Sequence, residues 1–265
     1  MKFGCFGFVN QLDDIVACGF DTAELDLCEI AAMDEKSFSK FYEKAMGSGL
    51  TFEVFSGLLP LSVRIHGQDF DREKWLSHID LASRRAALLG ARMIPFGAGK
   101  CRSIPEGCAD VLAARRRTAE FISSICGIFQ KYGLDLVIEP LGPANSNFLN
   151  RVGETAVFAA SLGKENCHTM CDLRHMHKTK DDFGTICENR EEIRHAHIDY
   201  PRGDLRRFPQ ENDGYDYGPY FEALLRSGYD GILTIEAASF ENFRAEADKS
   251  LRFLKKCEYE ALLRL

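Results

Sequence analysis

The sequence has no long hydrophobic run, and none of its apolar stretches approaches the roughly 18 residues that a membrane-spanning helix requires. Its first residues also lack the extended apolar segment and cleavage site of a secretory signal peptide. We therefore expect a cytoplasmic protein with no membrane partner. Hydrophobic residues still make up 45% of the 265 positions, which is enough to build a sizeable core.

No CxxC pair occurs among the ten cysteines. The cysteines are scattered through strand-like and helix-like stretches, as small buried hydrophobic residues usually are in a chain of this length. A disulfide framework is therefore not expected. Cys101 and Cys108 fall in a loop-like segment and are the two that could be exposed.

Long basic runs are also missing, and the formal net charge is −7. The arginines at residues 115–117 lie within a helical pattern and fit a solvated helix face. Because an acidic chain is poorly suited to bind a phosphate backbone, nucleic acid is not the expected partner. The first strand-like run is not followed by a GxGxxG turn, which argues against a dinucleotide-binding open sheet.

What is present is a regular alternation of strand-like and helix-like stretches. The pattern predicts helices over residues 71–90, 105–132 and 240–265, and glycines follow or end the first two. The predicted strands cover residues 2–8, 23–27, 51–57, 92–96, 134–139, 168–173, 193–199 and 231–236. Eight units of about 33 residues match a (β/α)8 TIM barrel, which takes roughly 250 residues. Since no linker or change in composition interrupts the pattern, we expect an α/β protein with one barrel domain over residues 1–265.

Four ionisable side chains stand at the C-terminal ends of the last four predicted strands: Glu139, Asp172, His197 and Glu236. A buried carboxylate is costly unless it is paired or bound to a metal. In barrels the active site forms at the C-terminal ends of the strands, and neighbouring strands lie only about 4.8 Å apart. These side chains are therefore expected to reach one shared cation. Three carboxylates and an imidazole suit Mn²⁺ first, with Mg²⁺, Co²⁺ or Zn²⁺ as alternatives.

Four protein ligands would leave up to two positions of an octahedral cation for adjacent oxygens of a hydroxy-ketone. The cation would polarise the carbonyl and acidify the neighbouring C–H bond. Glu139 and Glu236 could then remove and return a proton through a metal-bound enediolate. Return to the neighbouring carbon would isomerise the substrate, and return to the opposite face would epimerise it.

The chain resembles the xylose isomerase-like TIM barrel superfamily, in its sugar phosphate isomerase/epimerase branch. The resemblance spans nearly the whole chain. Its motifs are FGAGKCRSIPEG (96–107), IEPLGPANSNFLN (138–150), CDLRHMH (171–177), HAHIDYPRGDLRRFP (195–209) and YDYGPYFEALLRSGYDGILTIE (215–236). The likeness implies a small sugar, sugar phosphate or polyol derivative as substrate, and a homodimer or homotetramer as the assembled form.

The resemblance also assigns expected roles to particular residues. The metal ligands it implies are Glu139, Asp172, His197 and Glu236, and the two glutamates double as the catalytic proton-transfer pair. His175 is expected to bind a substrate oxygen. An arginine after the metal histidine is expected to bind the substrate as well. Arg202 is the closest match, with Arg206 and Arg207 as nearby candidates.

One position departs from the family pattern. Relatives that act on free ketohexoses carry a further glutamate shortly after the first metal glutamate, where this chain has Asn145. The substrate therefore stays open at this point. Lys100 and Arg102, in the loop after the fourth predicted strand, could contact a phosphate group or could belong to a solvated loop.

Two other enzyme classes use related sites. A keto-polyol dehydratase would share the metal site but eliminate a hydroxyl group as water. A DNA-repair enzyme of the endonuclease IV type needs a cluster of about three zinc ions and additional histidines. Residues 1–65 and 79–167 contain no histidine, so this second alternative is disfavoured.

Three further residues could support the site from behind. Glu24 and Asp26 close the second predicted strand. One of them could face the cleft and bind substrate or support the metal ligands, or could equally be a hydrogen-bonded carboxylate at the barrel rim. His195 shares strand parity with His197 but lies farther from the strand end. It is therefore expected in the core or behind the metal ligands.

Overall fold

The computed structural model describes all 265 residues and contains one sheet of eight parallel strands. The strands are β1 (Lys2–Gly7), β2 (Thr22–Asp26), β3 (Phe55–Ser56), β4 (Met93–Phe96), β5 (Asp135–Ile138), β6 (Cys167–Asp172), β7 (Ile193–Ile198) and β8 (Ile232–Ile235). Their order is β3-β2-β1-β8-β7-β6-β5-β4, and a single bridge between Val54 and Met93 joins the two ends. The predicted (β/α)8 barrel is therefore confirmed.

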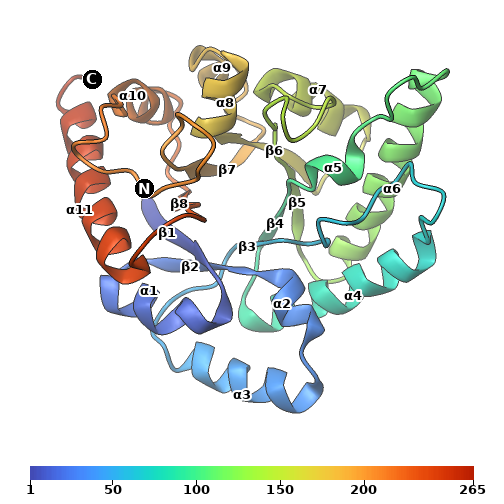
Figure 1. The fold of residues 1–265 in the computed structure, drawn as a ribbon, viewed down its shortest axis with the longest axis horizontal. Helices are drawn as coiled ribbons and strands as arrows, with labels where there is room; N and C mark the ends of the chain where they lie inside the picture. The colour runs from blue at the N-terminus through green and yellow to red at the C-terminus, as the bar shows by residue number, and fades with distance from the viewer.

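Helices surround this barrel on its outside (Figure 1). They are η1 (Val9–Gln11), α1 (Leu12–Cys18), α2 (Leu27–Ala32), α3 (Glu35–Met46), α4 (Arg72–Leu89), α5 (Gly99–Arg102), α6 (Val111–Gln130), α7 (Val152–Ser161), α8 (Leu173–Thr179), α9 (Gly184–Glu188), α10 (Gly218–Arg226) and α11 (Phe243–Leu262). The N-terminal amino group lies 2.8 Å from a Glu258 oxygen on α11, so the two ends of the chain meet on one side. No helix is both long enough and apolar enough to cross a membrane.

The long helix α4 shows why the sequence pattern was informative. Asp71 precedes the helix, and its Oδ1 accepts a hydrogen bond from the Lys74 N–H, which satisfies one free amide of the first turn. Gly90 ends the helix in the left-handed conformation at φ 103°, which a residue with a side chain adopts only at a cost. The predicted helix over residues 71–90 is confirmed within one residue at each end.

Two predicted elements differ from the structure. The third strand, predicted over residues 51–57, has only two residues, and isolated bridges at Thr51 and Val54 extend its pairing. The helix predicted over residues 105–132 begins only at Val111, because Asp110 caps it by accepting from the Ala113 N–H. The preceding residues form an irregular segment on the same face of the molecule as α5.

The strand register brings the four predicted metal ligands to the same height along the barrel axis. Asp172, the last residue of β6, lies opposite His197 of β7. Glu236 directly follows β8, and its N–H donates to the Ile198 carbonyl of β7 at 3.0 Å. Glu139 directly follows β5. The C-terminal ends of four consecutive strands therefore present their side chains at the same rim.

Candidate metal centre and active site

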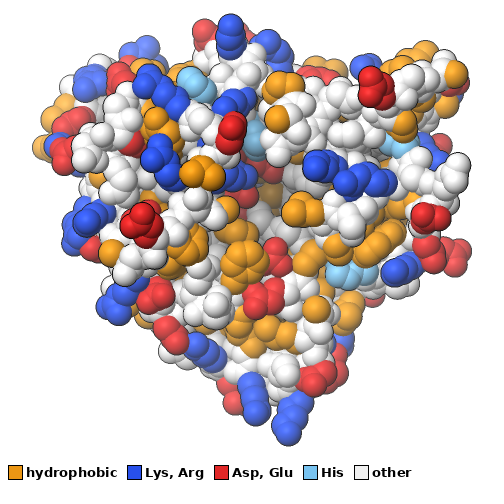
Figure 2. Space-filling view, in the orientation of Figure 1, with side chains coloured by type: hydrophobic (Ala, Val, Ile, Leu, Met, Phe, Trp, Pro, Cys, Tyr) orange, Lys and Arg blue, Asp and Glu red, His pale blue; other side chains and the backbone are white.

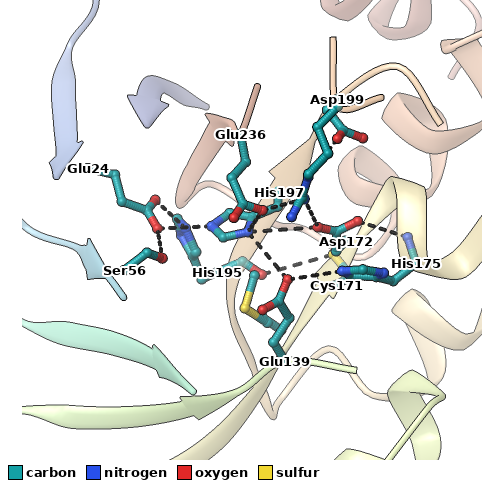
Figure 3. Close-up of polar contacts among 12 residues, drawn as sticks. Glu24, Ser56, Glu139, Cys171, Asp172, His175, His195, His197, Asp199 and Glu236 are labelled. Atoms are coloured by element: carbon teal, nitrogen blue, oxygen red, sulfur yellow. Dashed lines mark hydrogen bonds and ion pairs between the residues drawn. The ribbon is translucent and has the colours of Figure 1, made fainter. Parts of the chain in front are cut away.

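The four residues that the sequence predicts as metal ligands meet in space. One ligand atom from each of Glu139, Asp172, His197 and Glu236 lies within 4.8 Å of all the others. The first three are buried, and Glu236 is partly exposed at the barrel mouth. Figure 3 shows their side chains turned toward one point at the end of the barrel.

His197 Nδ1 is at the centre of this group. It lies 3.1 Å from a Glu236 oxygen, 3.7 Å from a Glu139 oxygen and 3.8 Å from an Asp172 oxygen. These are distances between pairs of ligand atoms, and they are longer than a metal–ligand bond. A cation can therefore lie between the four atoms and bind donors on several sides. The arrangement fits a divalent cation that prefers oxygen ligands.

Two buried atoms in the group support this fit. His197 Nδ1 and Glu139 Oε1 are both inaccessible to solvent and have no hydrogen-bond partner in the protein. A buried polar atom without a partner costs about 1–3 kcal/mol, so native structures rarely retain one without a reason. A cation coordinated by both atoms supplies the missing interaction.

The charges around these atoms point the same way. Burial, the largest influence, raises the pKa of Asp172, but the electrostatic influence of the neighbouring His175 and Arg206 outweighs it and lowers that pKa to about 2. Burial would lower the pKa of His197, yet Glu24 and Glu236 raise it well above its ordinary value. The lowered pKa of Asp172 and the raised pKa of His197 both mark a place where negative charge gathers and positive charge is favoured.

Arg206 is the one arginine inside the site. Its guanidinium donates to Asp199 at 2.8 Å, to Asp172 at 3.2 Å and to the Glu236 carboxylate. The resemblance placed Arg202 here first, but Arg202 is exposed, and its guanidinium lies 5.6 Å from the centre of the Tyr215 ring. The structure brings Arg206, the second candidate, to the site in its place, because the loop after β7 folds back at this point.

His175 presents one nitrogen to the site. Its Nδ1 accepts a hydrogen bond from the Gly142 N–H at 3.0 Å, so the ring proton is on Nε2. That Nε2 is buried without a hydrogen-bond partner and lies 3.6 Å from a Glu139 oxygen. His175 also lines the cavity, and it can therefore donate a hydrogen bond to a ligand there.

A second cluster lies directly behind His197. Glu24 of β2 accepts hydrogen bonds from His195 Nε2 at 2.9 Å and from His197 Nε2 at 3.0 Å. Ser56 of β3 donates to the same carboxylate at 2.5 Å. Of the roles left open from sequence, Glu24 therefore supports His197, a candidate ligand, and His195 lies behind it.

A cavity of about 420 Å³ opens in front of the four candidate ligands. Its inner wall includes Glu139, His175, Arg206 and Glu236, and its outer wall is largely apolar. Figure 2 shows acidic side chains in the hollow near the centre of this face, with hydrophobic side chains gathered beside them. The apolar wall comes from the last residues of β1 and β4 and from the segments that follow β1, β3, β4 and β5. It comprises Phe6, Phe8, Leu58, Leu59, Pro60, Leu61, Pro95, Phe96, Ala98 and Leu141.

Gly97 in this wall leaves room for a ligand carboxylate. A Cβ atom at this position would collide with Glu139 Oε2. We expect Gly97→Ala to displace Glu139 and to weaken cation binding about tenfold or more, as displaced metal-site partners commonly do. Isothermal titration with Mn²⁺ measures this change. Gly127→Ala, on an open face of α6 with no atom near the added Cβ, serves as the control and should bind as the wild type does.

The loop after β4 buries one of its two basic residues. Arg102 is fully buried, and its guanidinium donates to the backbone carbonyls of Phe96, Glu139, Phe148 and Leu149. Of the two roles left open from sequence, Arg102 is therefore not a solvated loop charge, and its bonds to the backbone engage the nitrogens that a phosphate contact would need. Lys100 is exposed and does not line the cavity. Cys101, one of the two cysteines that could have been exposed, is buried, and no cysteine forms a disulfide.

Arg102 instead joins the loops that follow β4 and β5. Arg102→Met would remove one donor from each of four carbonyls, and it would leave the Glu139 carbonyl with no donor, because the other three still accept from Leu141 N–H, Ser146 Oγ–H or Glu139 N–H. We expect the free energy of unfolding in urea to fall by about 1–3 kcal/mol, the usual cost of one buried acceptor left without a partner. Arg116→Met, on the exposed face of α6, should change it by less than about 0.5 kcal/mol. An equal effect of the two substitutions would contradict this interpretation.

A barrel of eight parallel strands is a TIM barrel, and the acidic, histidine-containing cluster lies at its C-terminal rim, where the active sites of that fold form. The chain matches the xylose isomerase-like TIM barrel family over residues 12–257 and belongs to that family.

Known proteins similar to this chain include sugar epimerases. A ketose 3-epimerase of Arthrobacter globiformis is 28% identical over 134 residues, which is 50% of this chain and 43% of that protein. The match therefore spans less than half of that relative's length.

Two solved structures share the fold over nearly their whole length. The D-psicose 3-epimerase of Clostridium cellulolyticum H10 with D-tagatose has a TM-score of 0.83 at 17% identity, covering 97% of this chain and 99% of that one. The 3-keto-D-glucoside 4-epimerase of E. coli has a TM-score of 0.80 at 20% identity, covering 97% of this chain and 100% of that one.

Proposed function

We propose that this chain is a divalent-metal-dependent epimerase or isomerase of a small sugar or polyol derivative, and that it works by proton transfer. One observation carries the proposal: Glu139 and Glu236 reach the same cavity from the ends of β5 and β8, within 4.8 Å of each other and of a third carboxylate and an imidazole. Two carboxylates beside one cation-binding position are what proton removal and return at a sugar carbon require.

The residues that would hold the cation are Glu139, Asp172, His197 and Glu236. Manganese is the proposed ion, since the donor set is mainly oxygen with one nitrogen, and magnesium, cobalt or zinc would also fit. When bound, the cation polarises the substrate carbonyl and thereby acidifies the adjacent C–H bond.

The chain's own residues would move the proton. Glu139 lies in the inner wall between His175 and Gly97, and Glu236 lies at the partly exposed mouth beside Arg206. One glutamate would remove the proton next to the carbonyl, and the same or the opposite glutamate would return it. Return from the opposite side inverts the carbon, which is epimerisation.

Two further residues would bind and orient the substrate. His175 offers its Nε2–H to a substrate oxygen, because its Nδ1 is already engaged by the Gly142 N–H. Arg206 lines the cavity and would compensate negative charge that develops on a substrate oxygen. Its contacts with Asp172, Asp199 and Glu236 hold the guanidinium at the rim.

The charges of the cavity favour a sugar without a phosphate group. Arg206 is the only lysine or arginine in the lining, and three carboxylates already surround it. Asp26 adds another carboxylate to the lining. The similar proteins, a ketose 3-epimerase and a 3-keto-D-glucoside 4-epimerase, are named for sugars that carry a ketone. Asn145 lines the cavity, so it is one of the residues that would distinguish this substrate from those of relatives with a glutamate there.

Hydrogen–deuterium exchange tests the proposal. The protein, loaded with Mn²⁺, is incubated in D₂O with a panel of ketoses, keto-glycosides, keto-inositols and phosphorylated ketoses. Proton NMR should show loss of the C–H signal next to the ketone for at least one unphosphorylated member, with an epimer or isomer of unchanged mass as product. Loss of a water from the product would indicate dehydration instead, and no exchange across the panel would contradict the proposal.

A further inference from the structure

Glu24 lies at the closed back of the candidate metal centre and is fully buried. Its carboxylate is engaged by three side chains: His195, His197 and Ser56 donate to it at 2.9, 3.0 and 2.5 Å. Figure 3 shows Glu24 and Ser56 on one side of His197, with Asp172 and Glu139 beyond its other side. His197 therefore stands between a supporting carboxylate and the carboxylates of the cavity.

This contact crosses the interior of the barrel. Glu24 belongs to β2 and His197 to β7, and β1 and β8 separate these strands in the sheet. Strand pairing therefore does not bring the two residues together. Apolar side chains would fill the barrel centre without the cost of burying a charge, so the polar group at this position calls for a role other than packing.

The hydrogen bonds decide which nitrogen of His197 faces the cavity. Nε2 donates to Glu24, and that leaves Nδ1 toward Glu236 and Glu139. Nδ1 is the nitrogen without a hydrogen-bond partner. A histidine that binds a metal usually donates its other ring N–H to a carboxylate, which fixes the tautomer, orients the ring and makes the ligating nitrogen more basic.

The spacing of Glu24, His195 and His197 would allow a second cation among them, but the hydrogen bonds between these residues do not. The three ligand atoms lie within 4.8 Å of one another. However, the two Nε2 atoms that face Glu24 already form hydrogen bonds with its two oxygens. A cation there would have to break both bonds, whereas one on the cavity side uses His197 Nδ1 and Glu139 Oε1, which lack hydrogen-bond partners.

We propose that Glu24, itself oriented by His195 and Ser56, is a positioning residue that holds His197 as an Nδ1 ligand and sets how tightly the chain binds its cation. This inference rests on the proposed metal site. Ser56 and His195 contribute by occupying the remaining acceptor positions of Glu24, so that the carboxylate cannot turn away from His197.

Cation affinity tests the inference without any substrate. Isothermal titration with Mn²⁺ should show binding about 10- to 100-fold weaker in Glu24→Gln than in the wild type, the range that loss of such supporting partners commonly gives. Ser56→Ala keeps the carboxylate and should give a smaller loss. The control is Asp181→Asn, which alters a buried carboxylate that accepts from the Val152 N–H away from the cavity, and it should leave the affinity unchanged.

Two substitutions of His195 distinguish a positioning role from a purely structural role in folding. His195→Gln can still place an amide N–H near Glu24 and should recover most of the affinity that His195→Leu loses. In the Zn²⁺-loaded, ¹⁵N-histidine-labelled protein, His197 should carry its proton on Nε2 in the wild type and lose that slowly exchanging signal in Glu24→Gln.

Equal affinity of wild type and Glu24→Gln would overturn the positioning role and leave the metal site intact. Should Glu24→Gln fail to fold, an unchanged affinity in Ser56→Ala together with His195→Leu would overturn it equally. Absence of binding in the wild type would instead refute the proposed metal site, so the two failures can be told apart.

Discussion

Glu139→Gln should reduce proton exchange at the substrate carbon by about 10²- to 10⁴-fold, the usual contribution of a positioned general acid or base. Glutamine keeps the size of the side chain and an oxygen that can face the cation, but it cannot accept the proton. Glu236→Gln should give a loss of the same order, because the reaction requires removal and return of a proton. Both variants are assayed in D₂O at a Mn²⁺ concentration that saturates each of them.

The matched control makes the same substitution at the other end of the barrel. Glu53 pairs with Lys2 at 2.6 Å, at the start of β1, where residues of a barrel serve stability. Glu53→Gln should leave the exchange rate within about twofold of the wild type, as expected for a change at the end of the barrel opposite the candidate site. If Glu139→Gln and Glu236→Gln retain full exchange at saturating Mn²⁺, the two glutamates are not the proton-transfer pair.

Asp172→Asn should lower cation affinity by at least about 100-fold, because loss of an outer partner alone already costs about 10- to 100-fold. Asp172 has a second role as the N-cap of α8, where its Oδ1 accepts from the His175 N–H at 2.9 Å. Asparagine caps helices about as well as aspartate does. The substitution therefore removes the charge of a ligand while it preserves the local fold.

The same change at a second helix cap is the appropriate comparison. Asp71 caps α4 by accepting from the Lys74 N–H at 3.0 Å and lies outside the cavity. Asp71→Asn should bind Mn²⁺ as the wild type does, and both variants should unfold at similar temperatures without added metal. Equal affinities for Asp172→Asn and the wild type would remove Asp172 from the ligand set.

The strand ends could be predicted because the hydrophobic pattern and the ionisable residue at its end indicate the same position. A short apolar run that ends in an ionisable residue marks both a buried strand and its rim, and this rule located Glu139, Asp172, His197 and Glu236 at neighbouring strand ends. The same agreement of signals located helix α4, where a cap residue, an apolar period and a final glycine coincide.

Contacts that cross the barrel could not be predicted in this way. Nothing in the local sequence of β2 shows that Glu24 faces His197 rather than the substrate, since that depends on the shape of the closed barrel. The choice between Arg202 and Arg206 depends on how the loop after β7 folds. That loop has no helical or strand-like hydrophobic pattern from which its conformation could be predicted. The position of Arg102 places it in a loop, but the loops after β4 and β5 close over it and accept hydrogen bonds from all three of its nitrogens.

The third strand and the start of α6 show a further limit. Residues 51–57 have an apolar pattern typical of a strand, yet only Phe55 and Ser56 pair continuously, because β3 stands at the edge where the barrel closes through one bridge. The segment before α6 contains Pro105 and Gly107, and Gly107 adopts φ 70°, which a helix does not permit. Tertiary closure therefore decides element lengths that periodicity leaves open.

The position of the cation is the claim on which the other conclusions depend, and anomalous diffraction from crystals grown with Mn²⁺ measures it directly. One peak is expected on the cavity side of His197, roughly 2.0–2.4 Å from Nδ1 and from an oxygen of Glu139, Asp172 and Glu236. No peak at that position, or a peak between Glu24, His195 and His197 instead, would contradict the account.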